Sequence, residues 1–167
     1  HQKGSIYTNN SSDEEFGLNK LSGKELSYNN YNDIFAALAI SKSLPKNTGT
    51  VIIKHGNPCG VSAINDNLES YKSALHCDPV SAFGGVVSCN YKITKKIALE
   101  LNKIFLEVII ADNFDTDALK ILKSKKNLRL INGSRVIFKT TFKSNTFNNL
   151  TLIQSEDNTV LSKKNFR

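Results

Sequence analysis

Short apolar runs alternate along the chain with longer segments whose apolar residues recur at helical spacing. The short runs are rich in Val, Ile and Leu, and such runs predict buried strands. They lie at residues 50–54, 85–90, 108–112 and 127–132. The longer segments predict helices, and they lie at residues 34–44, 68–76, 95–105 and 117–125. Strands that alternate with helices along the chain are typical of an α/β fold, in which helices flank a mostly parallel sheet.

Polar residues at the ends of these segments predict where they begin and stop. Asn32 or Asp33 is suited to cap the first helix, as Thr94 and Asp115 are for the later ones. The sequence Asn-Pro-Cys-Gly at 57–60 follows the first strand and predicts a turn there.

The pattern changes near the carboxyl end of the chain. Residues 134–167 alternate polar and apolar side chains without helical spacing, which favours strand or extended structure. We therefore expect one α/β subdomain over 1–133 and a β or extended tail over 134–167.

Composition narrows the class of protein. The chain has 167 residues, 40% hydrophobic and 22% charged, which is typical of a globular domain. No apolar run approaches the ~18 residues that a membrane span requires. Three cysteines without a C-x-x-C pair argue against a disulfide framework and against zinc, and they favour a reducing, cytoplasmic setting.

The net charge of +7 raises the question of a nucleic-acid partner. Lysine and asparagine are abundant throughout the chain rather than on one segment, so a solvated surface is the favoured interpretation. No helix-turn-helix or RNA-recognition motif is present, and a basic RNA-binding module stays the remote alternative.

Three places could carry chemistry, because ligands of open parallel sheets bind beyond strand ends. Lys54 and His55 end the first strand, residues 81–85 (SAFGG) precede the second, and Glu107 lies at the start of the third. Each also has an ordinary structural explanation. Lys54 suits a solvated charge and His55 a satisfied surface group, whereas Phe83 suits a plug over the core.

Lys54 and His55 are more informative together than apart. A histidine can accept a proton near neutral pH, and a neighbouring ammonium can stabilise negative charge on oxygen. Adjacent strand residues point to opposite faces, so both can reach one ligand only where the strand has ended. We expect Asn57 and Pro58 to supply that turn.

The chain resembles the bifunctional AICAR transformylase/IMP cyclohydrolase family of purine biosynthesis. The motifs K-H-x-N-P-C-G and S-A-F-G-G, in this order and spacing, are specific to it. The matching segments are HQKGSIY, LSGKELSYNNYNDIFAAL, VIIKHGNPCGV, DPVSAFGGVVSCN, FLEVIIAD, ALKILKSKKNLRLI and LTLIQSEDN.

The resemblance implies a zinc-free, cytidine-deaminase-like α/β fold and a formyltransferase. The family moves a formyl group from 10-formyltetrahydrofolate to AICAR, and a separate domain closes the product to IMP. It implies that His55 is the proton acceptor and that Lys54 stabilises the transition state. Gly84 and Glu107 would contact AICAR, with Phe83 and Asn57 shaping the pocket.

The resemblance also implies partners that lie elsewhere. Family active sites form across a homodimer, and a second half of the transformylase supplies most of the folate site. We therefore expect the segment 1–167 to be inactive alone. An inactive remnant of the enzyme is the alternative to a functional part of it.

Overall fold

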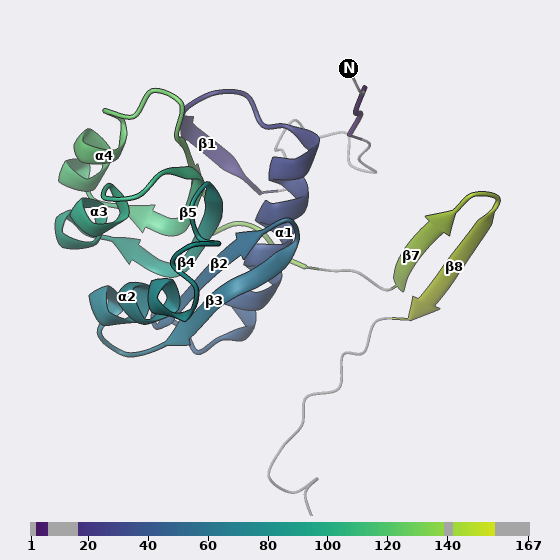
Figure 1. The fold of residues 1–167 in the computed structure, drawn as a ribbon, viewed down its shortest axis with the longest axis horizontal. Helices are drawn as coiled ribbons and strands as arrows, with labels where there is room; N and C mark the ends of the chain where they lie inside the picture. Colours follow the sequence, from purple (N-terminus) through teal and green to yellow (C-terminus); the bar gives the residue numbers. More distant parts are fainter. Residues whose placement is uncertain (1–2, 7–16, 139–141, 156–167) are drawn as a thin grey trace, which may run out of the picture. The chain divides into compact units, whose positions relative to one another are not determined.

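The computed structural model describes residues 3–6, 17–138 and 142–155. These residues fall into two compact units, divided between Val136 and Ile137 (Figure 1). Among the helices of the described residues, none has both the length and the apolarity needed to cross a membrane.

The first unit is one six-stranded sheet with helices on both faces. Its strands are β1 (Asn19–Ser22), β2 (Gly49–Lys54), β3 (Asn57–Ala63), β4 (Gly85–Ile93), β5 (Leu106–Phe114) and β6 (Arg129–Asn132). Its helices are α1 (Tyr28–Ser43), α2 (Asn67–Cys77), α3 (Lys95–Leu101) and α4 (Thr116–Leu122). The strand order across the sheet is β1-β6-β5-β4-β2-β3.

The helices cover the two faces unequally. Helix α1 covers one face, and α2, α3 and α4 gather on the other (Figure 1). Successive β2 residues follow this division, since Ile52 packs in the cluster under α2 to α4 and Ile53 in the cluster under α1. The expected α/β fold, with helices flanking a mixed sheet, is confirmed.

Parallel pairing is confined to β4, β5 and β6. Strand β2 runs antiparallel to both β4 and β3, and β1 runs antiparallel to β6. The sheet therefore has less parallel pairing than the alternation of strands and helices suggested. The cause is that β2 and β3 form a hairpin, which needs no crossover helix.

Helix α1 begins earlier than its apolar residues indicated. Ser27 is the N-cap, and its hydroxyl accepts the backbone N–H of Asn30 at 3.2 Å, while the Asn30 amide oxygen accepts the N–H of Ser27 at 3.1 Å. This reciprocal pair is a capping box with asparagine at its third position. The prediction of a cap at Asn32 or Asp33 was wrong, because the first helical turn is polar.

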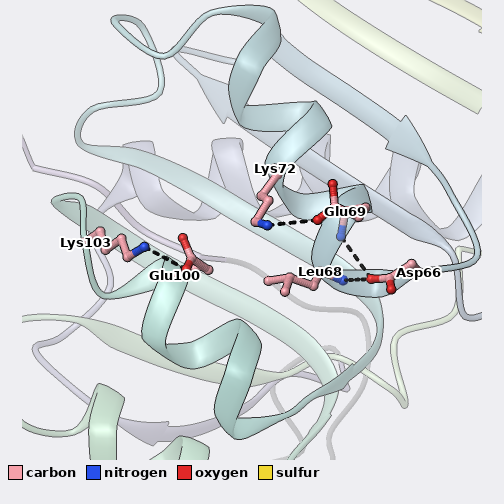
Figure 2. A network of polar contacts seen from close by, with 6 residues as sticks. All are labelled: Asp66, Leu68, Glu69, Lys72, Glu100 and Lys103. Carbon is pink, nitrogen blue, oxygen red and sulfur yellow. Dashed lines mark hydrogen bonds and ion pairs between the residues drawn. The ribbon is translucent and has the colours of Figure 1, made fainter.

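Helix α2 starts at an aspartate cap. The Asp66 carboxylate accepts the backbone N–H groups of Leu68 and Glu69 at 2.9 and 3.1 Å (Figure 2). On the exposed side of the same helix, Lys72 and Glu69 form an ion pair at 2.8 Å between positions i and i+3. At the end of α3, Glu100 pairs in the same i,i+3 arrangement with Lys103, which lies just beyond the helix, at 2.7 Å.

The segment 57–60, predicted to be a turn, is instead the start of β3. Pro58 is tolerated there because β3 is an edge strand of the sheet. The register shifts between Ile52 and Ile53, which pair with Gly60 and Pro58, so Cys59 is the extra residue of a bulge. At Gly60 a side chain would lie 1.9 Å from the Ala74 carbonyl oxygen of α2. Glycine is thus needed here for close packing and not for a turn.

A buried asparagine fixes the connection from α1 to β2. The Asn90 amide oxygen accepts the backbone N–H groups of Thr48 and Gly49, at 3.1 and 2.7 Å. Its amide nitrogen donates to the carbonyl of Ser41 at 2.9 Å. Because β4 carries Asn90, these bonds set the entry of β2 beside β4.

The second unit is a two-stranded antiparallel hairpin, β7 (Phe142–Phe147) and β8 (Leu150–Ser155). These strands lie within the tail 134–167, for which the sequence predicted strand or extended structure. Residues 156–167, also part of the predicted tail, lie outside the described residues.

Candidate functional site

Three chain segments meet at one end of the inner strands β2, β4 and β5, which we call the site edge. Ile53 of β2 pairs with Val86 of β4 in an antiparallel register, and Gly85 of β4 pairs with Leu106 of β5 in a parallel one. The end of β2, the loop before β4 and the start of β5 are therefore neighbours. Only β2 contributes its carboxyl end here, because β4 and β5 contribute their amino ends.

His55 lies at the tip of the β2–β3 hairpin. Lys54 pairs with Asn57, so His55 and Gly56 form a two-residue turn, with φ values of +52° and +74°. Positive φ at both positions is typical of a type I′ turn, whose twist matches that of the strands. The turn thus lies two residues before the predicted Asn57-Pro58, and His55 is exposed within it.

Two polar side chains fasten this turn. The Asn57 amide donates to the His55 carbonyl at 3.0 Å. From α1, the Asp33 carboxylate accepts the backbone N–H of Gly56 at 2.7 Å. The turn is therefore attached both to its own hairpin and to a helix on one face of the sheet.

Lys54 reaches the loop that precedes β4. Its ammonium donates to the Phe83 carbonyl at 2.7 Å. Gly84 leaves room for the ammonium, since a Cβ at this position would lie 2.8 Å from the Lys54 Nζ atom. Gly84 also has a φ of +70°, a conformation that side chains disfavour. The backbone conformation requires glycine most, since the flexible Lys54 side chain can move away from a Cβ.

An aromatic pair flanks the ammonium. Phe83 is 63% exposed, and its ring lies 5.3 Å from that of Phe105, tilted by 47°. The Phe105 carbonyl accepts the N–H of Gly84 at 2.8 Å. The two rings offer an apolar surface beside the Lys54 charge.

A bulge aims Glu107 toward α1. Gly85 and Val86 pair with Leu106 and Val108, so Glu107 is the extra residue between them. Its carboxylate accepts the side-chain N–H of Asn30 at 2.8 Å, and Arg129 lies 4.0 Å away. A bulge re-aims side chains in this manner at many strand ends.

Helix α1 therefore contacts two parts of the edge. Asn30 bonds Glu107 and Asp33 bonds the hairpin turn, and these residues stand three positions apart on one helix face. Neither contact, nor the presence of Phe105 and Arg129 here, was predicted from the sequence. The available signal was a pair of polar residues at i,i+3, Asn30 and Asp33, in the first half of a helix whose next inward residues are apolar.

Cys59 lies in the β3 bulge beside this edge. Its thiol donates to the Ile52 carbonyl at 3.5 Å, and partial burial raises the pKa of the thiol. The thiol therefore stays protonated at neutral pH and is a poor nucleophile. Within the described ranges, no three His, Cys, Asp or Glu side chains gather as a metal site.

The arrangement combines an imidazole, an ammonium, a carboxylate and an exposed aromatic surface. A family model described as the AICARFT/IMPCHase bienzyme matches residues 1–167. The chain belongs to the AICARFT/IMPCHase family. The resemblance of its motifs to that family is thereby confirmed.

Curated relatives of this AICARFT/IMPCHase chain include two bacterial proteins named bifunctional purine biosynthesis protein PurH. The chain is 46% identical to the Bacillus cytotoxicus protein over 148 residues, which cover 87% of the chain and 28% of the relative. It is 46% identical to the Aquifex aeolicus protein over 134 residues, 78% of the chain and 26% of the relative. The chain thus spans about a quarter of the length of these relatives.

A solved structure also resembles the AICARFT/IMPCHase chain in fold. It is RibD of Acinetobacter baumannii, which is 14% identical with a TM-score of 0.47. The match covers 60% of the chain and 35% of RibD.

Proposed function

We propose that this chain forms the AICAR-binding part of a formyltransferase in purine biosynthesis. The reaction transfers the formyl group of 10-formyltetrahydrofolate, a cosubstrate, to the 5-amino group of AICAR. The observation that supports this proposal is that Lys54 and His55, the loop residues Phe83 to Gly85, and Glu107 come from neighbouring segments at the site edge. The alternative is that the chain is a remnant without activity, and the chimera experiment distinguishes the two.

His55 and Lys54 take the two chemical roles. The AICAR amine is a weak nucleophile, because its lone pair is delocalised into the ring and the carboxamide. As its nitrogen attacks the formyl carbon, His55 accepts the amine proton. The carbonyl oxygen becomes an oxyanion, which the Lys54 ammonium stabilises. The oxyanion then collapses, the bond from carbon to the folate nitrogen breaks, and that nitrogen leaves with the proton that His55 had accepted.

The geometry gives a reason for Lys54 as the stabilising cation. An ammonium has three N–H donors, and one of them is used by the Phe83 carbonyl at 2.7 Å. That bond holds the charge beside Gly84 without consuming its other donors. A charge placed before the reaction needs little reorganisation during it.

The remaining residues suit contacts with AICAR. The Gly84 backbone can lie against the ligand because the residue has no side chain, and the Glu107 carboxylate suits hydroxyl or N–H donors. The exposed Phe83 ring offers a face to a planar base. Asn57 bonds the His55 carbonyl and shapes the pocket next to the turn.

We further propose that the activity belongs to a larger protein. The relatives are about four times as long as the segment that this chain covers. A homodimer with a separate IMP cyclohydrolase domain, and a folate site outside residues 1–167, complete the proposed enzyme.

The test is a chimera in which this chain replaces the matched segment of the Bacillus cytotoxicus protein. The chimera should transfer formyl groups to AICAR. His55→Ala and Lys54→Ala should each lower kcat about 10²- to 10³-fold, as expected for loss of a general base or an oxyanion donor. Stopped assays with 10-formyltetrahydrofolate and AICAR measure this.

Matched controls exist on the exposed surface. His76→Ala on α2 and Lys96→Ala on α3 remove the same side-chain types at exposed positions that are not among the candidate site residues. Both should keep kcat within about twofold, as surface substitutions usually do. A folded chimera without formyl transfer, or a His55→Ala variant with normal kcat, would overturn the proposal.

A further inference from the structure

The His55–Gly56 turn has a backbone conformation that needs external support. His55 has a φ of +52°, and a non-glycine residue in this region costs about 1–3 kcal/mol. Such a residue persists only where its surroundings over-determine it. The hairpin itself contributes the Lys54–Asn57 pair and the Asn57 side-chain bond to the His55 carbonyl.

Support from outside the hairpin comes from a side chain of α1. The Asp33 Oδ1 atom accepts the Gly56 N–H at 2.7 Å, across 23 positions of sequence. A hydrogen bond from a backbone amide to a carboxylate is stronger than one between neutral groups. It fixes the peptide plane between His55 and Gly56, and thereby the direction of the His55 side chain.

Asp33 is itself held rigidly. The next residue of α1, Ile34, is completely buried, and it packs in the same core cluster as Val51 and Ile53 of β2. The helix and the strand that ends in the turn therefore share one core. A carboxylate on such an element keeps its position better than one on a loop.

We propose that Asp33 is a positioning residue, which holds the His55–Gly56 turn so that the imidazole faces the substrate. This inference rests on the role of His55 proposed above. It predicts that loss of the Asp33 acceptor lowers kcat and spares KM for AICAR, because a displacement of about 1 Å can cost 10²-fold in rate.

The first experiment does not depend on activity. Amide hydrogen exchange of Gly56, read by NMR on the 167-residue chain, should be about tenfold faster in Asp33→Ala, since that variant removes the acceptor. Asp33→Asn keeps an amide oxygen at the same place and should retain most of the protection. Unchanged Gly56 protection in Asp33→Ala would overturn the proposal, even if formyl transfer were confirmed.

The second experiment uses the chimera. Asp33→Ala should lower kcat about 10- to 100-fold with KM for AICAR within about twofold, and Asp33→Asn should recover most of kcat. Asn29→Ala, an exposed change in the same helix, is the control for α1. Equal losses in Asp33→Asn and Asp33→Ala would assign the effect to charge and overturn positioning. An inactive parent chimera would refute the proposed function and leave the exchange result to decide on Asp33.

Discussion

Two residues beside the proposed chemistry, His55 and Gly84, have left-handed backbone conformations. At Gly84 the residue type fits the conformation, because glycine adopts positive φ at little cost. At His55 the fit is weaker, since histidine adopts positive φ more often than most side chains but far less readily than glycine. The identity of the Lys54–His55 pair was readable from the sequence, but the turn that displays it was placed two residues too late.

Gly84→Ala tests the space around the Lys54 ammonium. The new Cβ would lie 2.8 Å from the Nζ atom and would force an unfavourable φ, at a cost of about 1–2 kcal/mol. We expect Lys54 to be displaced and kcat of the chimera to fall about 10- to 100-fold, as for a misplaced catalytic group.

Val80→Ala is the control for this loop, because Val80 is 84% exposed. It should leave kcat and the urea midpoint unchanged. Activity of Gly84→Ala within twofold of the parent would show that the ammonium does not need this position.

At the scale of elements, the apolar runs predicted β2, β4, β5 and β6 well. Strands buried on both faces are recognisable because they consist of consecutive Val, Ile and Leu residues. Strand β3 escaped, since Asn-Pro-Cys-Gly has the composition of a turn. Its pairing with β2 overrides that local preference, and its place at the sheet edge removes the penalty for proline. The predicted first helix, over 34–44, was too short. The first turn of α1 is polar and so lacks the apolar residues from which the helix was predicted.

Gly60→Ala tests the contact between β3 and α2. A methyl group there would lie 1.9 Å from a backbone oxygen of Ala74, so strand and helix must move apart. Overpacking of this kind typically costs about 1–3 kcal/mol of unfolding free energy. Urea denaturation followed by circular dichroism measures the loss.

Val61→Ala, the neighbouring change on the same strand, should cost less, because Val61 is 39% exposed. If Gly60→Ala were as stable as the parent chain, the close approach of α2 to β3 would be wrong.

At the scale of the whole molecule, the strand order could not be predicted. Alternating strands and helices favour parallel neighbours, but nothing in the sequence places β2 antiparallel beside β4. That placement brings the end of β2 next to the starts of β4 and β5. The candidate residues were thus identifiable one by one, whereas their convergence required the fold.

Because the chain forms two compact units, we expect the thermal stability of the first unit not to depend on the hairpin. Both buried clusters of the first unit lie between Leu18 and Val136, whereas the side chains of the β7–β8 hairpin are exposed within the described part of the chain. An isolated hairpin is marginal in water. A chain ending at Val136 should therefore keep the thermal midpoint of the parent to within a few degrees, read by circular dichroism.

A chain ending at Asn127 is the comparison, since it removes β6 with the buried Leu130 and Ile131. It should fail to fold cooperatively. Absence of a cooperative thermal transition in the chain ending at Val136 would show that the first unit is not independent.

The proline and the bulge of β3 have a consequence for solubility. An open sheet edge invites pairing with strands of other molecules, and that pairing is a common start of aggregation. Pro58 offers no amide hydrogen to such a strand, and the bulge at Cys59 interrupts a regular ladder. The segment that begins just after the His55–Gly56 turn thus also protects the sheet edge against unwanted association.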